Sequence, residues 1–113
     1  MAWLYYKINT YRAYSVSAKT PGYENTSAFI TLFWGGNPHA RLWFTKGDAD
    51  PTLPNGEVDI GVPPFYYVRF RGTQFSDVLD LLRNEKPVYL HWNDTSKGAF
   101  LATTKEPVGE EEG

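Results

Sequence analysis

The stretch Ser27–Lys46, SAFITLFWGGNPHARLWFTK, contains two alternating runs of residues on either side of a glycine-rich turn. Alternation with a period of two residues is typical of a β-strand with one buried side. The intervening Gly35-Gly36-Asn37-Pro38 has the residue types that form turns between paired strands. The stretch therefore predicts a β-hairpin. Its expected core-facing residues are Ala28, Ile30, Leu32, Trp34, Ala40, Leu42 and Phe44.

Further extended segments are predicted on both sides of this hairpin. Residues 3–18 contain no Pro or Gly and are rich in Tyr, Val, Thr and Ser, which fits either one long bent strand or a second hairpin. Residues 65–71 alternate like the first hairpin, and residues 58–62 could form a short edge strand. Residues 88–93 and 99–104 predict a C-terminal hairpin around the turn at 94–98.

One amphipathic helix is predicted over residues 74–84. Its apolar residues recur at helical spacing: Phe75, Val78, Leu79 and Leu82. Thr73 is the expected N-cap residue, and Pro87 follows the end of the helix.

These elements predict the α+β class. The expected fold is an antiparallel, curved β-sheet with one amphipathic helix before the C-terminal hairpin. Residues 1–105 are expected to form a single domain, because no shift in composition divides them. Residues 106–113 form an acidic tail that we expect to be disordered.

The net charge of −2 is unevenly distributed along the 113 residues. Four of the 13 acids follow Lys105, whereas all 11 Lys and Arg residues lie at or before it. Residues 1–105 thus carry 9 acids and 11 bases, a net charge of +2. This excess is too small to indicate a nucleic-acid partner by itself.

The composition argues against several classes of protein. The absence of cysteine excludes disulfides, thiolate metal sites and cysteine nucleophiles. The N-terminus does not have the pattern of a signal peptide, and no apolar stretch approaches the ~20 residues that span a bilayer. The sequence therefore predicts a cytoplasmic protein without a membrane partner, and no motif in it indicates a cofactor.

The outward residues of the predicted strands are unusual for a solvated sheet face, which normally carries Thr, Lys, Glu and Ser. Here aromatic rings are mixed with arginine and histidine. The candidate set for a ligand or partner face is Phe29, Phe33, His39, Arg41, Trp43, Phe65, Tyr67, Arg69 and Arg71.

Three interpretations of this set remain open. The sheet could curl so that both faces are partly core. Two copies could pack sheet to sheet as a homodimer, since Trp, Tyr, Phe and Arg are enriched at interfaces. The face could also bind single-stranded nucleic acid by stacking bases on aromatic rings and holding phosphates with arginine.

The signals for catalysis are weak, so the sequence favours a non-enzymatic binding module that associates with itself. Two histidines, His39 and His91, lack a clear catalytic partner. A small-ligand or hydrolytic domain is a further alternative, with a pocket between the sheet and residues 47–64 that one histidine should border. The acids of that loop, Asp48, Asp50, Glu57 and Asp59, do not match an EF-hand, and no metal site is predicted.

Overall fold

The computed structural model describes residues 3–58 and 65–103. The expected disordered tail and part of the expected 58–62 edge strand lie outside these residues. The elements in chain order are β1 (Trp3–Lys7), β2 (Thr10–Ser15), β3 (Thr26–Trp34), β4 (Asn37–Thr45), β5 (Gly56–Val58), β6 (Phe65–Phe70), the 3₁₀ turn η1 (Gly72–Gln74), α1 (Phe75–Asn84), β7 (Tyr89–Asn93) and β8 (Ala99–Ala102).

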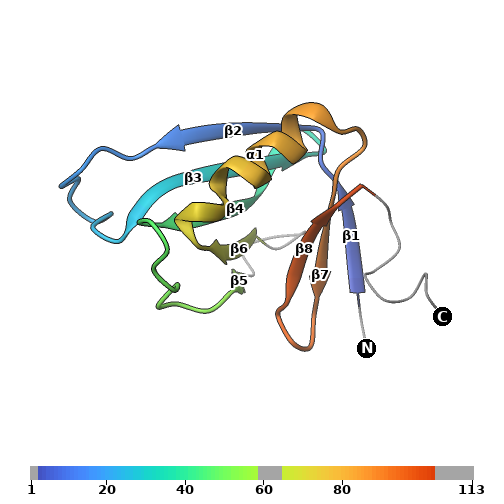
Figure 1. Cartoon of the computed structure of the whole chain (residues 1–113). Helices are drawn as coiled ribbons and strands as arrows, with labels where there is room; N and C mark the ends of the chain where they lie inside the picture. Colours follow the sequence, from blue (N-terminus) through green and yellow to red (C-terminus); the bar gives the residue numbers. More distant parts are fainter. Residues whose placement is uncertain (1–2, 59–64, 104–113) are drawn as a thin grey trace.

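The fold is α+β, as predicted, and contains two sheets. Five strands form the larger sheet in the order β2-β3-β4-β6-β5, and three form the smaller sheet in the order β1-β7-β8. Figure 1 shows α1 lying over the larger sheet, with the smaller sheet beside one end of it. The larger sheet has β2 and β5 as its edges, so it is not closed into a barrel.

The N-terminal segment is neither one strand nor a hairpin, because its two halves pair in different sheets. β1 pairs with β7, whereas β2 pairs with β3, both in antiparallel fashion. Ile8 and Asn9, the two residues between β1 and β2, form the junction between the sheets. The amide of Ile8 donates to the carbonyl of Val88 at 2.9 Å, and the amide of Asn9 donates to the carbonyl of Phe33 at 2.8 Å. The N-terminal segment thus joins the two sheets through main-chain hydrogen bonds.

The larger sheet is mixed. β4 and β6 run parallel, whereas every other neighbouring pair of strands is antiparallel. A parallel pair needs a crossover of about a dozen residues or more, and residues 46–64 supply that length. Part of this connection returns as the short edge strand β5, which pairs with β6.

The helix begins later than its sequence pattern predicts. Thr73 lies inside η1 and its hydroxyl donates to Asp48 Oδ1 at 3.3 Å, so it does not cap α1. The Gln74 side chain accepts a hydrogen bond from the amide of Arg71 at 2.9 Å instead. The 3₁₀ turn satisfies main-chain groups before α1 and shifts its start to Phe75.

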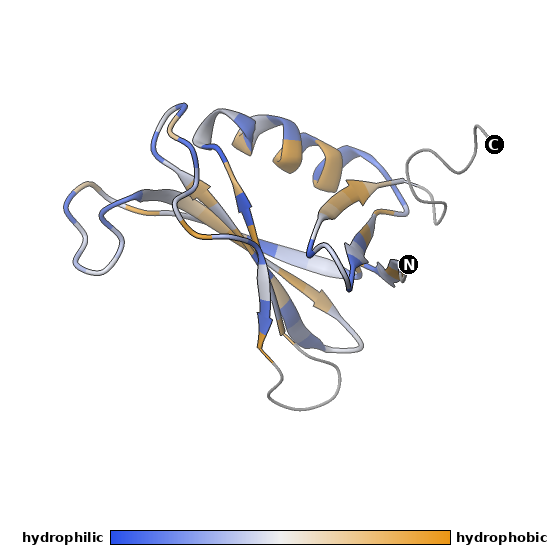
Figure 2. Ribbon diagram, turned by 90° about the horizontal axis from the view of Figure 1, so that it is seen from below, coloured by the Kyte–Doolittle hydropathy of each residue, from blue (hydrophilic) through white to orange (hydrophobic). Residues whose placement is uncertain are grey.

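One core is shared by both sheets and the helix. The predicted inner residues of the first hairpin are all buried, and they pack with Tyr66 and Val68 of β6, Val78 and Leu82 of α1, and Leu90 and Trp92 of β7. Figure 2 shows hydrophobic and hydrophilic residues alternating along α1 and the strands, as expected for elements with one buried side.

A tyrosine pair bridges the two sheets inside this core. The hydroxyls of Tyr6 and Tyr66 are 2.7 Å apart. Burial raises the pKa of Tyr66, and the hydrogen bond with Tyr6 raises it further. The ring of Trp34 stacks on Tyr6 with centroids 4.7 Å apart, so aromatic contacts continue from one sheet into the other.

The edge of the larger sheet is tied to the turn between β7 and β8. Asn55 accepts a hydrogen bond from the amide of Arg69 at 2.7 Å and donates one to the carbonyl of Lys97 at 3.0 Å. Lys97 Nζ lies 3.0 Å from Glu57 Oε1. The hydrogen bond with Glu57 raises the pKa of Lys97. These contacts hold the loop that precedes β5 against the smaller sheet.

Replacing Trp92 with alanine should lower the free energy of unfolding by about 3–5 kcal/mol, because a fully buried ring leaves a cavity. Urea denaturation followed by circular dichroism measures the loss. Leu53→Ala is the control, since Leu53 is 58% exposed and should change stability by less than about 0.5 kcal/mol. Equal losses in the two variants would contradict this description of the core.

Gly72→Ala should also destabilise the fold, by about 1–3 kcal/mol. A Cβ at this position would overlap the carbonyl oxygen of Thr45 and lie 2.8 Å from the carbonyl oxygen of Gly47. Both obstacles are main-chain atoms, so a side-chain rotation cannot relieve them. Gly56→Ala is the matched control, because a Cβ there meets no atom within 4 Å. Thermal unfolding of both variants tests the prediction, which fails if Gly72→Ala is as stable as Gly56→Ala.

Candidate binding face

The outward side of the larger sheet carries aromatic and arginine side chains in adjacent rows. We call this surface the arginine face and define it by the outward residues of β2, β3, β4 and β6. One row across these strands, set by their register, is Tyr14, Phe29, Trp43 and Arg69. The next row is Arg12, Thr31, Arg41 and Tyr67.

Each of the three arginines lies over at least one aromatic ring of this face. The Arg41 guanidinium carbon is 5.0 Å from the ring centroid of Phe29 and 5.5 Å from that of Trp43. The Arg69 guanidinium is 5.8 Å from Trp43 and 5.9 Å from Tyr67. Arg12 lies 5.1 Å above Phe33. These distances are within the range of cation–π attraction, about 6 Å.

The aromatic rings also contact one another. Tyr14 stacks on Phe29 with centroids 4.6 Å apart and an interplanar angle of 18°. Phe29 lies 5.1 Å from Trp43. Tyr23, from the loop between β2 and β3, lies about as close to both Phe29 and Trp43, at 6.1 and 6.0 Å. Tyr14 ends this cluster and is 41% exposed.

The outward strand residues of the arginine face carry positive charge and no negative charge. The outward residues of its four strands include Arg12, Arg41 and Arg69 but no Asp or Glu. None of the three arginines forms an ion pair with the described residues. Partial burial lowers the pKa of Arg69, which is the direction expected when a cation loses water without gaining a carboxylate.

The structure brings most of the predicted candidate residues together. Phe65 contacts Tyr67 with centroids 5.3 Å apart, so it continues the face at the start of β6. His39 lies beside an irregularity in the β3–β4 register, and its ring stacks on the buried Trp34 at 4.9 Å. Arg71 is bound to the loop after β4, through ion pairs with Asp48 and Asp50.

Sequence reasoning missed Arg12 and Tyr14 of the face, and also Tyr23, whose ring packs against it. The alternation of residues 10–15 contains a signal for the first two, since both have the same parity. That signal identifies a face only when the pairing of β2 with β3 is known. Tyr23 belongs to a loop, and no periodic pattern marks it.

A small hollow of about 180 Å³ lies at one end of the arginine face. Trp43 and Arg69 line it together with residues 44 and 45 of β4 and with residues 22, 24–26 and 51–53, which include one acid, Glu24. It lies between the sheet and the start of the 47–64 loop, where a small-ligand pocket was predicted, but the histidine expected at the border of that pocket is absent from its lining. The indole Nε1 of Trp43 is buried and has no hydrogen-bond acceptor among the described residues.

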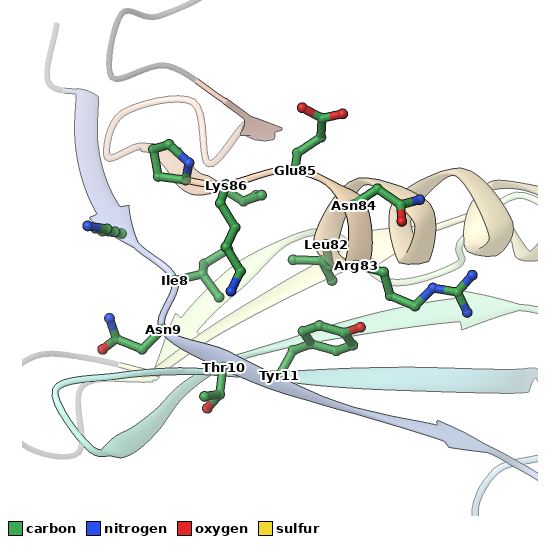
Figure 3. A pocket seen from close by; sticks show the side chains of 12 residues that line it. Ile8, Asn9, Thr10, Tyr11, Leu82, Arg83, Asn84, Glu85 and Lys86 are labelled. Carbon is green, nitrogen blue, oxygen red and sulfur yellow. The ribbon is translucent and has the colours of Figure 1, made fainter.

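A second, larger hollow of about 950 Å³ lies where the β1–β2 junction meets the C-terminal end of α1 (Figure 3). We call it the basic groove. Figure 3 shows Lys86 pointing into it and Glu85 pointing away. Its lining residues are Lys7, Ile8, Asn9, Thr10, Tyr11, Leu82, Arg83, Asn84, Glu85, Lys86, Pro87 and Val88.

Neither histidine lines either of these two hollows. His91 is fully buried in the smaller sheet, where its ring meets Tyr5 edge-on at 5.0 Å and Trp3 at 6.5 Å. We expected a histidine at the border of a small-ligand or hydrolytic pocket. Neither of these hollows has one.

The acids of the 47–58 segment are engaged by basic side chains. Asp48 and Asp50 pair with Arg71, and Glu57 pairs with Lys97. Asp59 lies outside the described residues. Within residues 3–58 and 65–103, no group of three or more His, Cys, Asp or Glu side chains is placed to hold a metal ion. In the same residues, no helix has the length and apolar character needed to cross a membrane.

Comparison of the chain with protein-family models, with curated proteins and with solved structures gives no match.

Removing an arginine from the face should have little effect on folding. Arg41→Met keeps most of the aliphatic stem and loses the cation–π contacts, which are worth about 0.5–1 kcal/mol each at exposed sites. Since two such contacts are lost, we expect the free energy of unfolding, measured in urea, to fall by no more than about 2 kcal/mol. A loss comparable to that of Trp92→Ala would mean that the guanidinium is part of the structural core.

Proposed function

We propose that this protein is a non-enzymatic binding module whose arginine face binds single-stranded nucleic acid. The observation that carries the proposal is the set of three guanidinium groups held over aromatic rings, without a carboxylate on the same face. Such a face offers positive charge to phosphates and planar groups to bases.

The stacking contacts prepare the arginines for anion binding. A guanidinium lying over a ring has already lost part of its conformational freedom, so less entropy remains to be lost when it binds a phosphate. Its fork of N–H groups can bind two phosphate oxygens at once. Arg41 also has one N–H directed to a side chain, since Nε donates to Thr31 Oγ1 at 3.4 Å.

The aromatic cluster provides a surface on which bases can stack. Tyr14 is the most suitable ring, because it is exposed and lies at the end of the stack with Phe29. Stacking of a base on an aromatic side chain contributes about 1–3 kcal/mol and tolerates any base. The face is therefore suited to a flexible, unpaired strand whose bases can turn toward it.

Self-association through this face is a second candidate, supported by its aromatic content. A two-fold interface places the same patch of both copies together. The face carries three arginines and no acid, so this packing would bring six guanidinium groups together without a counter-charge. Like charges across an interface are unfavourable, and we therefore place a polyanionic partner first.

Binding of a labelled single-stranded oligonucleotide of about ten nucleotides, measured by fluorescence anisotropy across a salt series, tests the proposal. If all three arginines contact phosphates, the slope of log K against log salt should be about −2, since each contact on a single strand contributes about −0.7. Arg41→Gln/Arg69→Gln should weaken binding roughly tenfold or more and reduce the slope to about −0.7.

Lys7→Gln/Lys86→Gln is the matched control, because it also removes two charges but from the basic groove. This variant should retain most of the affinity. Absence of binding by the wild type at low salt, or equal weakening in both variants, would refute the proposal. Light scattering on the same samples tests self-association: a dimer that becomes a folded monomer in Tyr67→Asp would favour the second candidate.

A further inference from the structure

We propose that the basic groove is the docking site of this chain's own acidic segment, Glu106–Glu112. The proposal concerns the helix side of the larger sheet and does not depend on nucleic-acid binding at the arginine face. Three observations support it: the charge of the groove, the sequence of the segment, and the position of the end of β8, after which the segment follows.

The groove has a basic rim and an apolar floor. Lys7, Arg83 and Lys86 line it together with a single acid, Glu85, which points away from the hollow (Figure 3). Neither lysine forms an ion pair with the described residues, whereas Arg83 lies 3.6 Å from Asp80. The apolar lining comes from side chains such as Ile8, Leu82 and Val88.

The segment has the complementary pattern. Its sequence, EPVGEEE, places an apolar Pro-Val pair between one glutamate and a run of three. No Lys or Arg interrupts it. A proline and a valine suit an apolar floor, while carboxylates on both sides suit lysines at the rim.

The last strand of the smaller sheet, β8, ends at the same end of that sheet as Lys7, which lines the groove. Ala102, the last residue of β8, is paired with Tyr89, and Tyr89 is paired in turn with Lys7. Neighbouring strands are about 4.8 Å apart, so the backbone of Lys7 lies about 10 Å from that of Ala102. Four extended residues span about 13 Å and eight span about 26 Å, so Glu106 and Glu110 can reach the rim.

The tether compensates for the weakness of the individual contacts. Exposed ion pairs contribute little on their own. A short covalent tether, however, keeps the segment at an effective concentration on the order of millimolar. Screening shortens the range of such attraction from about 10 Å at 0.1 M salt to about 3 Å at 1 M, so docking should be lost at high salt.

The chain contains no cysteine, so Gly109→Cys creates a unique site for a nitroxide spin label. In the full chain at low salt, the label should broaden the amide signals of Lys7, Tyr11 and Lys86 in ¹H–¹⁵N spectra. The broadening should disappear in 1 M salt, where the screening length is about 3 Å. It should also disappear in Lys7→Gln/Lys86→Gln and persist in Arg41→Gln/Arg69→Gln.

Every other pattern of broadening overturns the proposal. Broadening at Arg41 and Trp43, lost only in the Arg41→Gln/Arg69→Gln variant, would place the segment on the arginine face. Absence of broadening at low salt would mean that the segment does not bind the groove. If the lysine variant fails to fold, replacing all four glutamates of the segment with glutamine provides the same test, and persistence of the broadening there overturns the proposal.

Discussion

The pairing of β4 with both β3 and β6 is the constraint on which the rest of the structure depends. It places Leu42 and Phe44 in the core that the larger sheet shares with α1 and the smaller sheet, where both are fully buried. The same pairing places Arg41 and Trp43 on the opposite side, next to Tyr67 and Arg69 in the neighbouring strand. Because successive side chains alternate between faces, neither surface can be moved without moving the other. The register that builds the core therefore also builds the arginine face.

The alternation of the central strands was enough to predict which residues face inward, because period two is a local property of the chain. Leu32, Leu42 and Val68 are buried as their parity predicts. The helix and the C-terminal hairpin were also predicted from local patterns: helical spacing of apolar residues for the helix, and two extended runs around a turn for the hairpin. The sequence-based prediction was less complete for strand pairing, which depends on contacts between different segments of the chain. The separation of β1 from β2 and the parallel pairing of β4 with β6 depend on contacts that no local pattern encodes.

The candidate face was predicted in part, for the same physical reason. Phe29, Trp43 and Tyr67 belong to strands whose outward parity could be read directly, and the structure places them in adjacent rows. Arg12 joins them only because β2 pairs with β3, so its membership depends on register between segments far apart in sequence. Arg71 has the correct parity but lies beyond the end of β6, where loop carboxylates determine its contacts.

The distribution of ion pairs explains why the arginine face remains positive. Asp48 and Asp50 both pair with Arg71, and Glu57 pairs with Lys97, so these three described acids of the 47–58 segment hold loops and turns. These ion pairs neutralise Arg71 and Lys97, which hold loops and turns. The arginines of the sheet contact aromatic rings instead of carboxylates. A ring attracts a guanidinium but carries no net charge, so each stacked arginine keeps its full positive charge. Such a surface favours an anion with planar groups over a neutral apolar partner, because the latter would remove water from the guanidinium groups without supplying a counter-charge.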